Sequence, residues 1–219
     1  MYGYLINLQR RIASKVILEP FKSNIDYFGG IDVAFSKNFA FAAIVILDSS
    51  FNLVDVACGI SKIKLAYIPG LLSFREFPAI YQAYKNLNIK ADIYLVDGQG
   101  IAHPRGLGIA SHIGVILNIA TIGCAKKKLV GDYINPPNKK FSYTYLYNSI
   151  DTPIGAIVRS RERVKPIFVS PGHKTDIESS VNIIKRVITK YRLPEPIRYA
   201  HQYADRFKKE KLNNLKETI

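Results

Sequence analysis

The stretch that decides the fold is residues 31–63, IDVAFSKNFAFAAIVILDSSFNLVDVACGISKI. Its middle part, residues 39–48, is a continuous apolar run, as expected for a strand that is buried on both faces. Residues 31–35 before it and residues 53–63 after it have the pattern of two further strands, joined to the middle strand by short turns. The sequence therefore predicts an antiparallel meander of three strands.

Beyond the meander, helical and strand patterns alternate. Pro69 and Gly70 interrupt the chain, and residues 77–87 then carry an apolar stripe at helical spacing. Two short buried strands, residues 93–96 and 120–124, are separated by a helical segment at 109–117. This alternation favours parallel strands with crossover helices. We therefore expect an α/β fold with a mixed central sheet, the meander plus parallel strands, flanked by helices.

The last third of the chain is less regular. Residues 132–150 are rich in Asn, Pro, Lys and Tyr, which predicts a loop or a ragged hairpin. Thr175 and Glu178 match a capping box, so a helix should start there. Residues 201–219 are basic and polar and are expected to form a frayed helix or tail. The length fits one domain, so residues 1–219 are predicted to form a single domain.

The charge balance points to a polyanionic partner. Lys and Arg number 31 against 17 Asp and Glu, which gives a net charge of +14. Basic surfaces bind phosphate backbones, although a generally basic proteome or a membrane-surface preference gives the same excess. No run of about 18 uninterrupted apolar residues predicts a membrane span. Cys58 and Cys124 form neither a CxxC pair nor a zinc spacing, and with no signal-like segment this favours the cytoplasm.

Three carboxylates stand where chemistry is common. Asp32 interrupts an apolar strand, and its neighbours in the chain point to the opposite face. Asp97 ends a buried strand and is followed by Gly98, and ligands of α/β sheets gather at such strand ends. Glu76 falls in the first turn of the helix after Pro69-Gly70, on the face directed at the sheet.

These carboxylates converge if the first strand and the Asp97 strand are neighbours. A few carboxylates together with water and substrate phosphate are the ligands that Mg²⁺ prefers. Each residue alone has an ordinary structural explanation: Asp32 could cap a turn, Asp97 could belong to an Asp-Gly turn, and Glu76 could favour a helix start. Their order along the chain resembles the ribonuclease H-like nucleases, which favours a joint metal site.

Several segments resemble one family closely. The segments occur in the order and at the spacing of endonuclease V, and the resemblance runs from about residue 27 to residue 200. They are GGIDVAF (29–35), YIPGLLSFRE (67–76), VDGQGIAHPRGLGIASHIGV (96–115), TIGCAKKKL (121–129) and VSPGH (169–173).

The resemblance implies a ribonuclease H-like fold and a Mg²⁺-dependent nuclease, with Mn²⁺ as an alternative ion. The implied substrate is DNA that contains deoxyinosine or another deaminated base. Hydrolysis at the second phosphodiester bond 3′ to the lesion would leave 3′-hydroxyl and 5′-phosphate ends. The implied role is DNA repair by direct attack of water, and no Ser-His-Asp or Cys-His arrangement suggests a covalent intermediate.

The resemblance also implies roles for individual residues. Asp32, Glu76 and Asp97 would bind the metal, and Lys126 would lie near the attacked phosphate. His173 would lie at the rim of the active site.

A second set of residues would contact the nucleic acid. Tyr67-Ile68-Pro69-Gly70 would form a wedge that parts the strands at the lesion, and apolar wedges of this kind are common in proteins that distort duplexes. His103 would lie by the scissile region or the backbone. Because His103 and Arg105 flank Pro104, both could project from one loop toward phosphates.

Three alternatives remain open at this level. The chain could prefer inosine in RNA, or it could be a structure-specific nuclease of the same fold. A binding protein that recognises distorted DNA without cutting it is the third alternative, and the complete carboxylate trio argues against it. A monomer is expected, because no sequence feature suggests a dimer.

Overall fold

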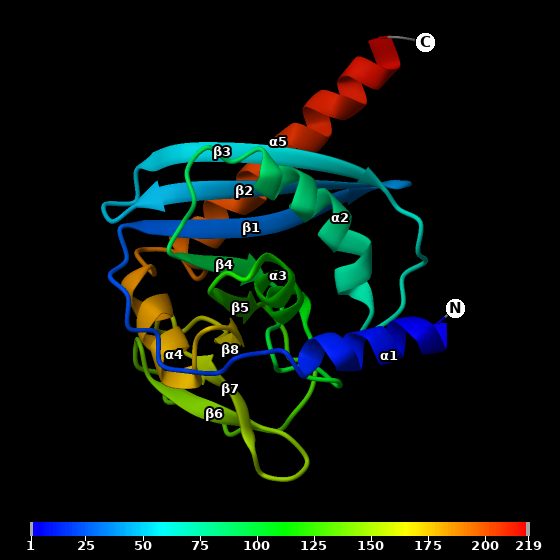
Figure 1. Cartoon of the computed structure of the whole chain (residues 1–219). Coiled ribbons are helices and arrows are strands. Elements are labelled where there is room, and N and C mark those ends of the chain that lie inside the picture. The colour runs from blue at the N-terminus through cyan, green and yellow to red at the C-terminus, as the bar shows by residue number, and fades with distance from the viewer. Residues whose placement is uncertain (1, 218–219) are drawn as a thin grey trace.

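Eight strands form one mixed sheet at the centre of the molecule (Figure 1). The computed structural model describes residues 2–217, with side chains up to Asn214. The strands are β1 (Tyr27–Ser36), β2 (Phe39–Asp48), β3 (Leu53–Lys62), β4 (Ile93–Asp97), β5 (Thr121–Ala125), β6 (Tyr143–Tyr147), β7 (Pro153–Val158) and β8 (Ile167–His173). Their order across the sheet is β3-β2-β1-β4-β5-β8-β7-β6.

The strand directions confirm the predicted mixed sheet. The meander β1-β2-β3 is antiparallel throughout, and β4 then pairs parallel to β1 and β5 parallel to β4. One strand lies within the segment predicted to be a loop or ragged hairpin, because β6 pairs antiparallel with β7. This extends the sheet by a further edge strand.

Helices cover both faces of the sheet. They are α1 (Tyr2–Ala13), α2 (Leu72–Lys85), α3 (Ile109–Leu117), α4 (Ile177–Arg186) and α5 (Glu195–Glu217). One apolar core joins the sheet to α2 and α3, and a second core joins it to α4 and the start of α5. Figure 1 shows α5 crossing the sheet behind β1 and β2, on the opposite side from α2.

The helix expected after Thr175 begins one residue later. Asp176 is its N-cap, and the Asp176 carboxylate accepts a hydrogen bond from the amide of Ser179 at 2.7 Å. The hydroxyl of Thr175 lies instead within 3.3 Å of the Ser180 hydroxyl. A carboxylate at the N-cap also interacts favourably with the helix dipole, which accounts for the shift.

The segment expected to be a frayed helix or tail is part of a long helix. Residues 201–217 continue α5, and residues 218–219 lie outside the described part of the chain. Ile197, Ala200 and Ala204 form a buried row at helical spacing that packs against the sheet. Burial of this row stabilises the helix, and helices gain most of their stability in this way. The polar composition of the exposed face concealed the pattern.

A glycine allows α5 to approach β1. A Cβ atom at Gly30 would lie 2.0 Å from the carbonyl oxygen of Pro196, far inside van der Waals contact. Only a residue without a side chain therefore lets the first turn of α5 lie on β1. This close approach brings the next turn of the helix to the end of β1 that carries Asp32.

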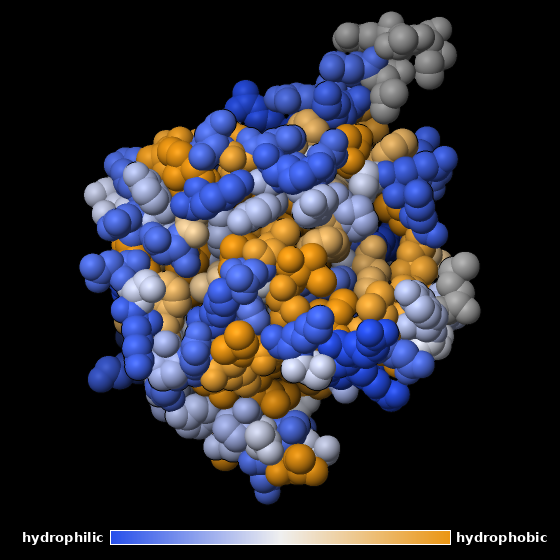
Figure 2. Space-filling view, viewed as in Figure 1, coloured by the Kyte–Doolittle hydropathy of each residue, from blue (hydrophilic) through white to orange (hydrophobic). Residues whose placement is uncertain are grey.

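The surface mixes polar and apolar areas. On the face shown in Figure 2, hydrophobic residues gather in several patches among hydrophilic ones. Among residues 2–217, no helix combines the length and the apolar character needed to cross a bilayer.

A buried histidine joins α2 to α3. His112 stacks on Phe77, with ring centroids 5.0 Å apart and planes 10° from parallel, and Phe74 meets the same ring edge-on. Its side chain is 4% exposed, and burial lowers the pKa of His112 to about 4. The neutral ring is therefore part of the apolar interface.

We predict that acid destabilises the fold through this residue. Between the unfolded pKa of 6.5 and the folded pKa of about 4, the unfolded chain binds more protons, so stability falls as the pH falls. From pH 7 to pH 5 the linkage lowers the free energy of unfolding by about 2 kcal/mol for this residue. Urea unfolding at both pH values should show that His112→Phe loses about 2 kcal/mol less than the parent. Equal losses in the two proteins would show that His112 does not carry this effect.

Candidate active site

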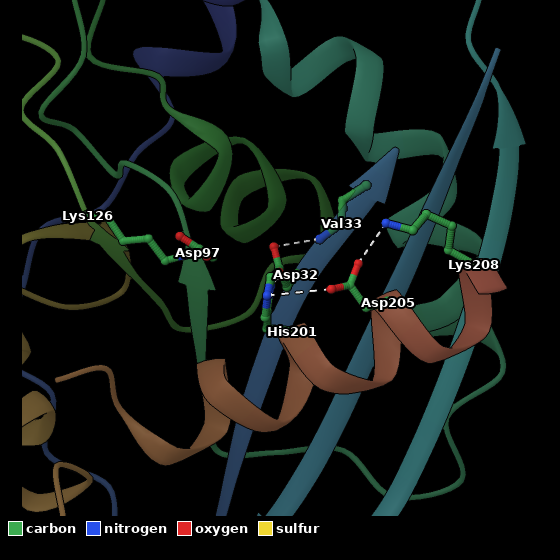
Figure 3. Close-up of polar contacts among 7 residues, drawn as sticks. All are labelled: Asp32, Val33, Asp97, Lys126, His201, Asp205 and Lys208. Atoms are coloured by element: carbon green, nitrogen blue, oxygen red, sulfur yellow. Dashed lines mark hydrogen bonds and ion pairs between the residues drawn. The ribbon is translucent and has the colours of Figure 1, made fainter. Parts of the chain in front are cut away.

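Asp32 and Asp97 lie side by side on two neighbouring strands in the middle of the sheet. Ile31 of β1 is paired with Val96 of β4, and the two aspartates are the next residues on these parallel strands. Carboxylate oxygens of Asp32 and Asp97 and a ring nitrogen of His201 all lie within 4.8 Å of one another. Figure 3 shows Asp32 on β1 next to Asp97 at the end of β4, with His201 of α5 beside Asp32. The predicted adjacency of the two strands is confirmed.

His201 was not recognised from the sequence. Its Nδ1 lies 2.7 Å from Oδ2 of Asp32, and its Nε2 lies 3.7 Å from a carboxylate oxygen of Asp205 (Figure 3). The available signal was the apolar row of α5, which would have made residue 201 helical and adjacent to a buried alanine. That row does not reveal which strand the helix crosses.

The clustering of charge is unfavourable for Asp32. Burial raises its pKa, and the negative charge of Asp97 raises it further. Hydrogen bonds from His201 and from the amide of Val33 oppose this effect. A cation placed between the aspartates would remove the same cost, since nearby positive charge favours the ionised form.

Glu76 is the most deeply buried carboxyl group of the three. It lies in the second turn of α2, one turn later than expected, because the helix begins at Leu72. Its face of the helix is directed at the sheet as predicted, and Ile80 and Ala83 are fully buried with it. Burial, followed by the charges of Asp32 and Asp97, raises the pKa of Glu76 to about 8.

Glu76 is therefore an electrostatic neighbour of the aspartates. Among the described residues it does not join the tight group of Asp32, Asp97 and His201. It lines the same cavity as Asp97, however, so both carboxyl groups border one space.

Lys126 completes the charged group. Its Nζ lies 2.5 Å from Oδ2 of Asp97, at the end of β5 beside β4. Burial alone would lower the pKa of Lys126, but the hydrogen bond and the charge of Asp97 outweigh burial and raise it. The ammonium group is therefore charged and held at the carboxylate of Asp97.

Residues 67–70 form an exposed turn that borders the same cavity as Glu76 and Asp97. The side chain of Tyr67 is 65% exposed, and the amide of Leu71 closes the turn on the carbonyl of Ile68 at 3.0 Å. Gly70 has φ +78, a left-handed conformation that glycine adopts without strain. We call residues 67–70 the wedge turn below.

A cavity separates the wedge turn from the carboxylates. Its walls come from the wedge turn, the start of α2, the end of β4 and the segment after β5. The lining residues are Tyr67, Pro69, Gly70, Leu72, Ser73, Glu76, Asp97, Gly98, Gln99, His103, Leu107, Gly108, Ile109 and residues 125–129.

His103 and Arg105 hold the wedge turn. Nε2 of His103 lies 3.1 Å from the carbonyl oxygen of Gly70, and Nη2 of Arg105 donates to the same oxygen at 2.7 Å. Only 8% of His103 is exposed, and its ring contacts the turn; its expected place by the scissile region or the backbone stays a prediction. Only Pro104 separates the two residues, so both side chains reach the same carbonyl oxygen.

His173 is not brought to the carboxylates. On β8 it is paired with Thr121, the first residue of β5, whereas Asp97 is paired with Cys124 at the other end of that strand. The Nδ1 of His173 accepts a hydrogen bond from the amide of Ile17 at 3.1 Å, and the residue is 3% exposed. The expected place at the active-site rim is therefore wrong: the antiparallel direction of β8 carries this residue to the far end of the sheet.

Comparisons with known proteins identify the family of the chain. Residues 10–202 match the family model described as endonuclease V. The endonuclease V of Thermosipho melanesiensis is 46% identical over 94% of this chain and 90% of that protein.

Two solved structures are also similar. Endonuclease V of Streptomyces avermitilis superposes with a TM-score of 0.92 at 32% identity, covering 97% of this chain and 95% of that one. Endonuclease V of Ciona intestinalis, solved with a 24mer DNA containing an inosine followed by a ribo-adenosine, superposes with a TM-score of 0.81 at 26% identity and covers 98% of each chain. Because the family model covers most of the chain and a curated relative is 46% identical over 94% of it, the chain belongs to the endonuclease V family.

Proposed function

We propose that this protein is a DNA-repair endonuclease that recognises deoxyinosine and hydrolyses the second phosphodiester bond on its 3′ side. The products would carry 3′-hydroxyl and 5′-phosphate ends. The observation that carries the proposal is the Asp32–Asp97 pair, of which Asp97 lines one cavity together with Glu76 and the wedge turn. The inosine in the DNA bound to the Ciona protein supports the choice of lesion.

The side chains at the site suit a hard divalent cation. Carboxylate oxygens of two aspartates within 4.8 Å of each other, and a buried glutamate whose pKa is raised by both of them, offer oxygen donors to such an ion. Asp32, Asp97 and Glu76 are the residues that would hold Mg²⁺, with Mn²⁺ as the second candidate. The chemistry that such an ion supplies is activation of water and neutralisation of charge on the phosphate.

The remaining groups act on position and charge. Lys126, held by Asp97, places an ammonium group where negative charge grows on the attacked phosphate, and a preorganised charge of this kind lowers the barrier. His201 fixes the carboxylate of Asp32 through its hydrogen bond. No side chain is needed as a covalent nucleophile.

The cavity suits an extruded base. Enzymes that act on a damaged nucleotide turn the base out of the helix into a pocket and read its edge there. Hypoxanthine pairs weakly, which lowers the energy of this step. Tyr67, exposed at the cavity mouth, would occupy the place the base leaves and would stack on the neighbouring bases.

An inosine-specific endoribonuclease is the second candidate. The DNA bound to the Ciona protein carries a ribo-adenosine directly after the inosine, so a ribose is accommodated at that position in a relative. Matched DNA and RNA strands with one inosine each, cut under identical conditions, separate the two candidates.

We further propose that the chain acts as a monomer and as one nuclease domain. The carboxylates, Lys126, His201 and the wedge turn all come from one chain and one continuous sheet. Light scattering of the protein alone and bound to DNA would test this.

The central test is cleavage of an end-labelled duplex that contains one deoxyinosine. With Mg²⁺, a single cut at the second phosphodiester bond 3′ to the lesion is expected, and none when adenine replaces hypoxanthine. Omission of the ion should abolish the cut. Cutting of branched DNA irrespective of inosine would instead identify a structure-specific nuclease.

We predict that neutralising the paired aspartates removes cleavage but not binding. Asp97→Asn should lower the cleavage rate by more than about 100-fold, since even outer-sphere partners of metal sites cost 10–100-fold. Quenched-flow cleavage under single-turnover conditions measures the rate, and fluorescence anisotropy measures binding. Asp151→Asn is the matched control, because it removes the same charge from an exposed carboxylate between β6 and β7, the last two strands of the sheet, outside the cavity lining. Retained cleavage in Asp97→Asn would refute the site.

We also predict that Tyr67→Ala impairs the cutting of duplexes. Loss of an aromatic ring that stacks on a base costs about 1–3 kcal/mol, so cleavage of duplex DNA should fall by about 10-fold to 100-fold. Cleavage of a single strand with the same lesion should fall less, because no partner strand has to be displaced. Tyr4→Ala, at an exposed tyrosine of α1, is the control. An equal decrease on both substrates would contradict the wedge role.

A further inference from the structure

The carbonyl oxygen of Gly70 has an unusual number of donors. His103 and Arg105 approach it as described, and the side-chain amide of Gln9 donates to it at 2.9 Å. A carbonyl oxygen has two lone pairs, so three donors on one oxygen mark a strongly fixed point of the backbone. This fixed point is the last residue of the wedge turn.

The hydrogen bonds around His103 indicate which of its ring nitrogens carries the proton. The Nδ1 of His103 accepts the amide of Arg105 at 3.2 Å, so its Nε2 carries the proton that is donated to Gly70. Burial, followed by the charge of Arg105, lowers the pKa of His103 to about 4, which keeps the ring neutral. The side chain of Arg105 approaches Gln9 as well, because its Nε donates to Oε1 of Gln9.

Gln9 uses all of its side-chain polar atoms. Its Nε2 donates to Gly70 and also to the carbonyl of Leu107 at 3.0 Å, while its Oε1 accepts from Arg105. The residue is fully buried, although α1 is otherwise largely exposed. The side-chain amide of Gln9 therefore connects α1 to two separate loops, one at Gly70 and one at Leu107.

We propose that Gln9 is a positioning residue for the wedge turn, and that α1 serves to hold this turn rigid while DNA strands are parted. This rests on the proposed function. An exposed Tyr67 can displace a base only if its backbone does not yield, and the Gly70 carbonyl is where the turn is anchored. Gln9 itself is buried and does not touch the nucleic acid.

The test compares duplex with single-stranded DNA. Gln9→Met keeps the size of the side chain and removes its hydrogen bonds, and Gln9→Asn keeps the amide but shortens its reach. Both should lower cleavage of a deoxyinosine duplex, Gln9→Met by about tenfold, and should leave cleavage of the same single strand within about twofold. Gln82→Met, which removes an amide acceptor on the exposed side of α2, is the matched control and should change neither substrate.

Two further measurements separate positioning from general damage. In an Asp97→Asn background, which does not cut, 2-aminopurine beside the lesion should show less strand opening when Gln9→Met is added. If Tyr67 is already alanine, Gln9→Met should cost nothing more on duplex DNA, because both changes act on one step. Thermal unfolding of each variant fixes a temperature at which all are folded.

The proposal is overturned if Gln9→Met reduces cleavage of both substrates equally, if duplex cleavage is unchanged, or if its effect adds to that of Tyr67→Ala. A parent protein that cuts neither deoxyinosine substrate would instead refute the proposed function.

Discussion

The structure depends on the parallel pairing of β1 with β4. This pairing places Asp32 and Asp97 next to each other on adjacent strands, with oxygens no more than 4.8 Å apart. Two negative charges at that distance repel by roughly 3 kcal/mol at an effective dielectric constant of about 20. A sheet that keeps such a pair accepts a cost to its own stability. Costs of this kind concentrate at functional sites, where a bound cation and a substrate phosphate can offset them.

The other elements supply what the pair lacks. α5 brings His201 to Asp32, and this is possible only because Gly30 lets the helix lie on β1. β5 ends in Lys126, whose ammonium group compensates Asp97. On the other side of the cavity, α1 and the loop of His103 and Arg105 hold the wedge turn. Rigid supports on both sides of one cavity suit a reaction in which a base must leave its stack.

Much of the fold followed from local patterns. The apolar run of β2 and the Pro-Gly break before α2 are signals within a few residues: β2 formed where expected, and α2 formed after the break but began early enough to place Glu76 in its second turn. The predictions of β6 and of the start of α4 were less accurate. β6 exists because it pairs with β7, and the choice between Thr175 and Asp176 as N-cap depends on contacts that the local sequence does not show. Residue 201 was expected in a frayed helix or tail, because the local sequence is basic and polar. Contact with the sheet stabilises that part of α5, and this contact is not visible in the sequence.

The sequence by itself determined which carboxylates could form a site, because Asp32, Glu76 and Asp97 lie in a strand, a helix and a strand end that local patterns predict. The order and spacing of the motifs also indicated the family. The tertiary structure alone decided that His201 joins them, that His173 lies at the far end of the sheet, and that His103 and Gln9 hold a turn. The physical reason is that sequence patterns report burial and periodicity along one element. The partners of a side chain are set by the direction of strands and the crossing of helices, which are properties of the packed whole.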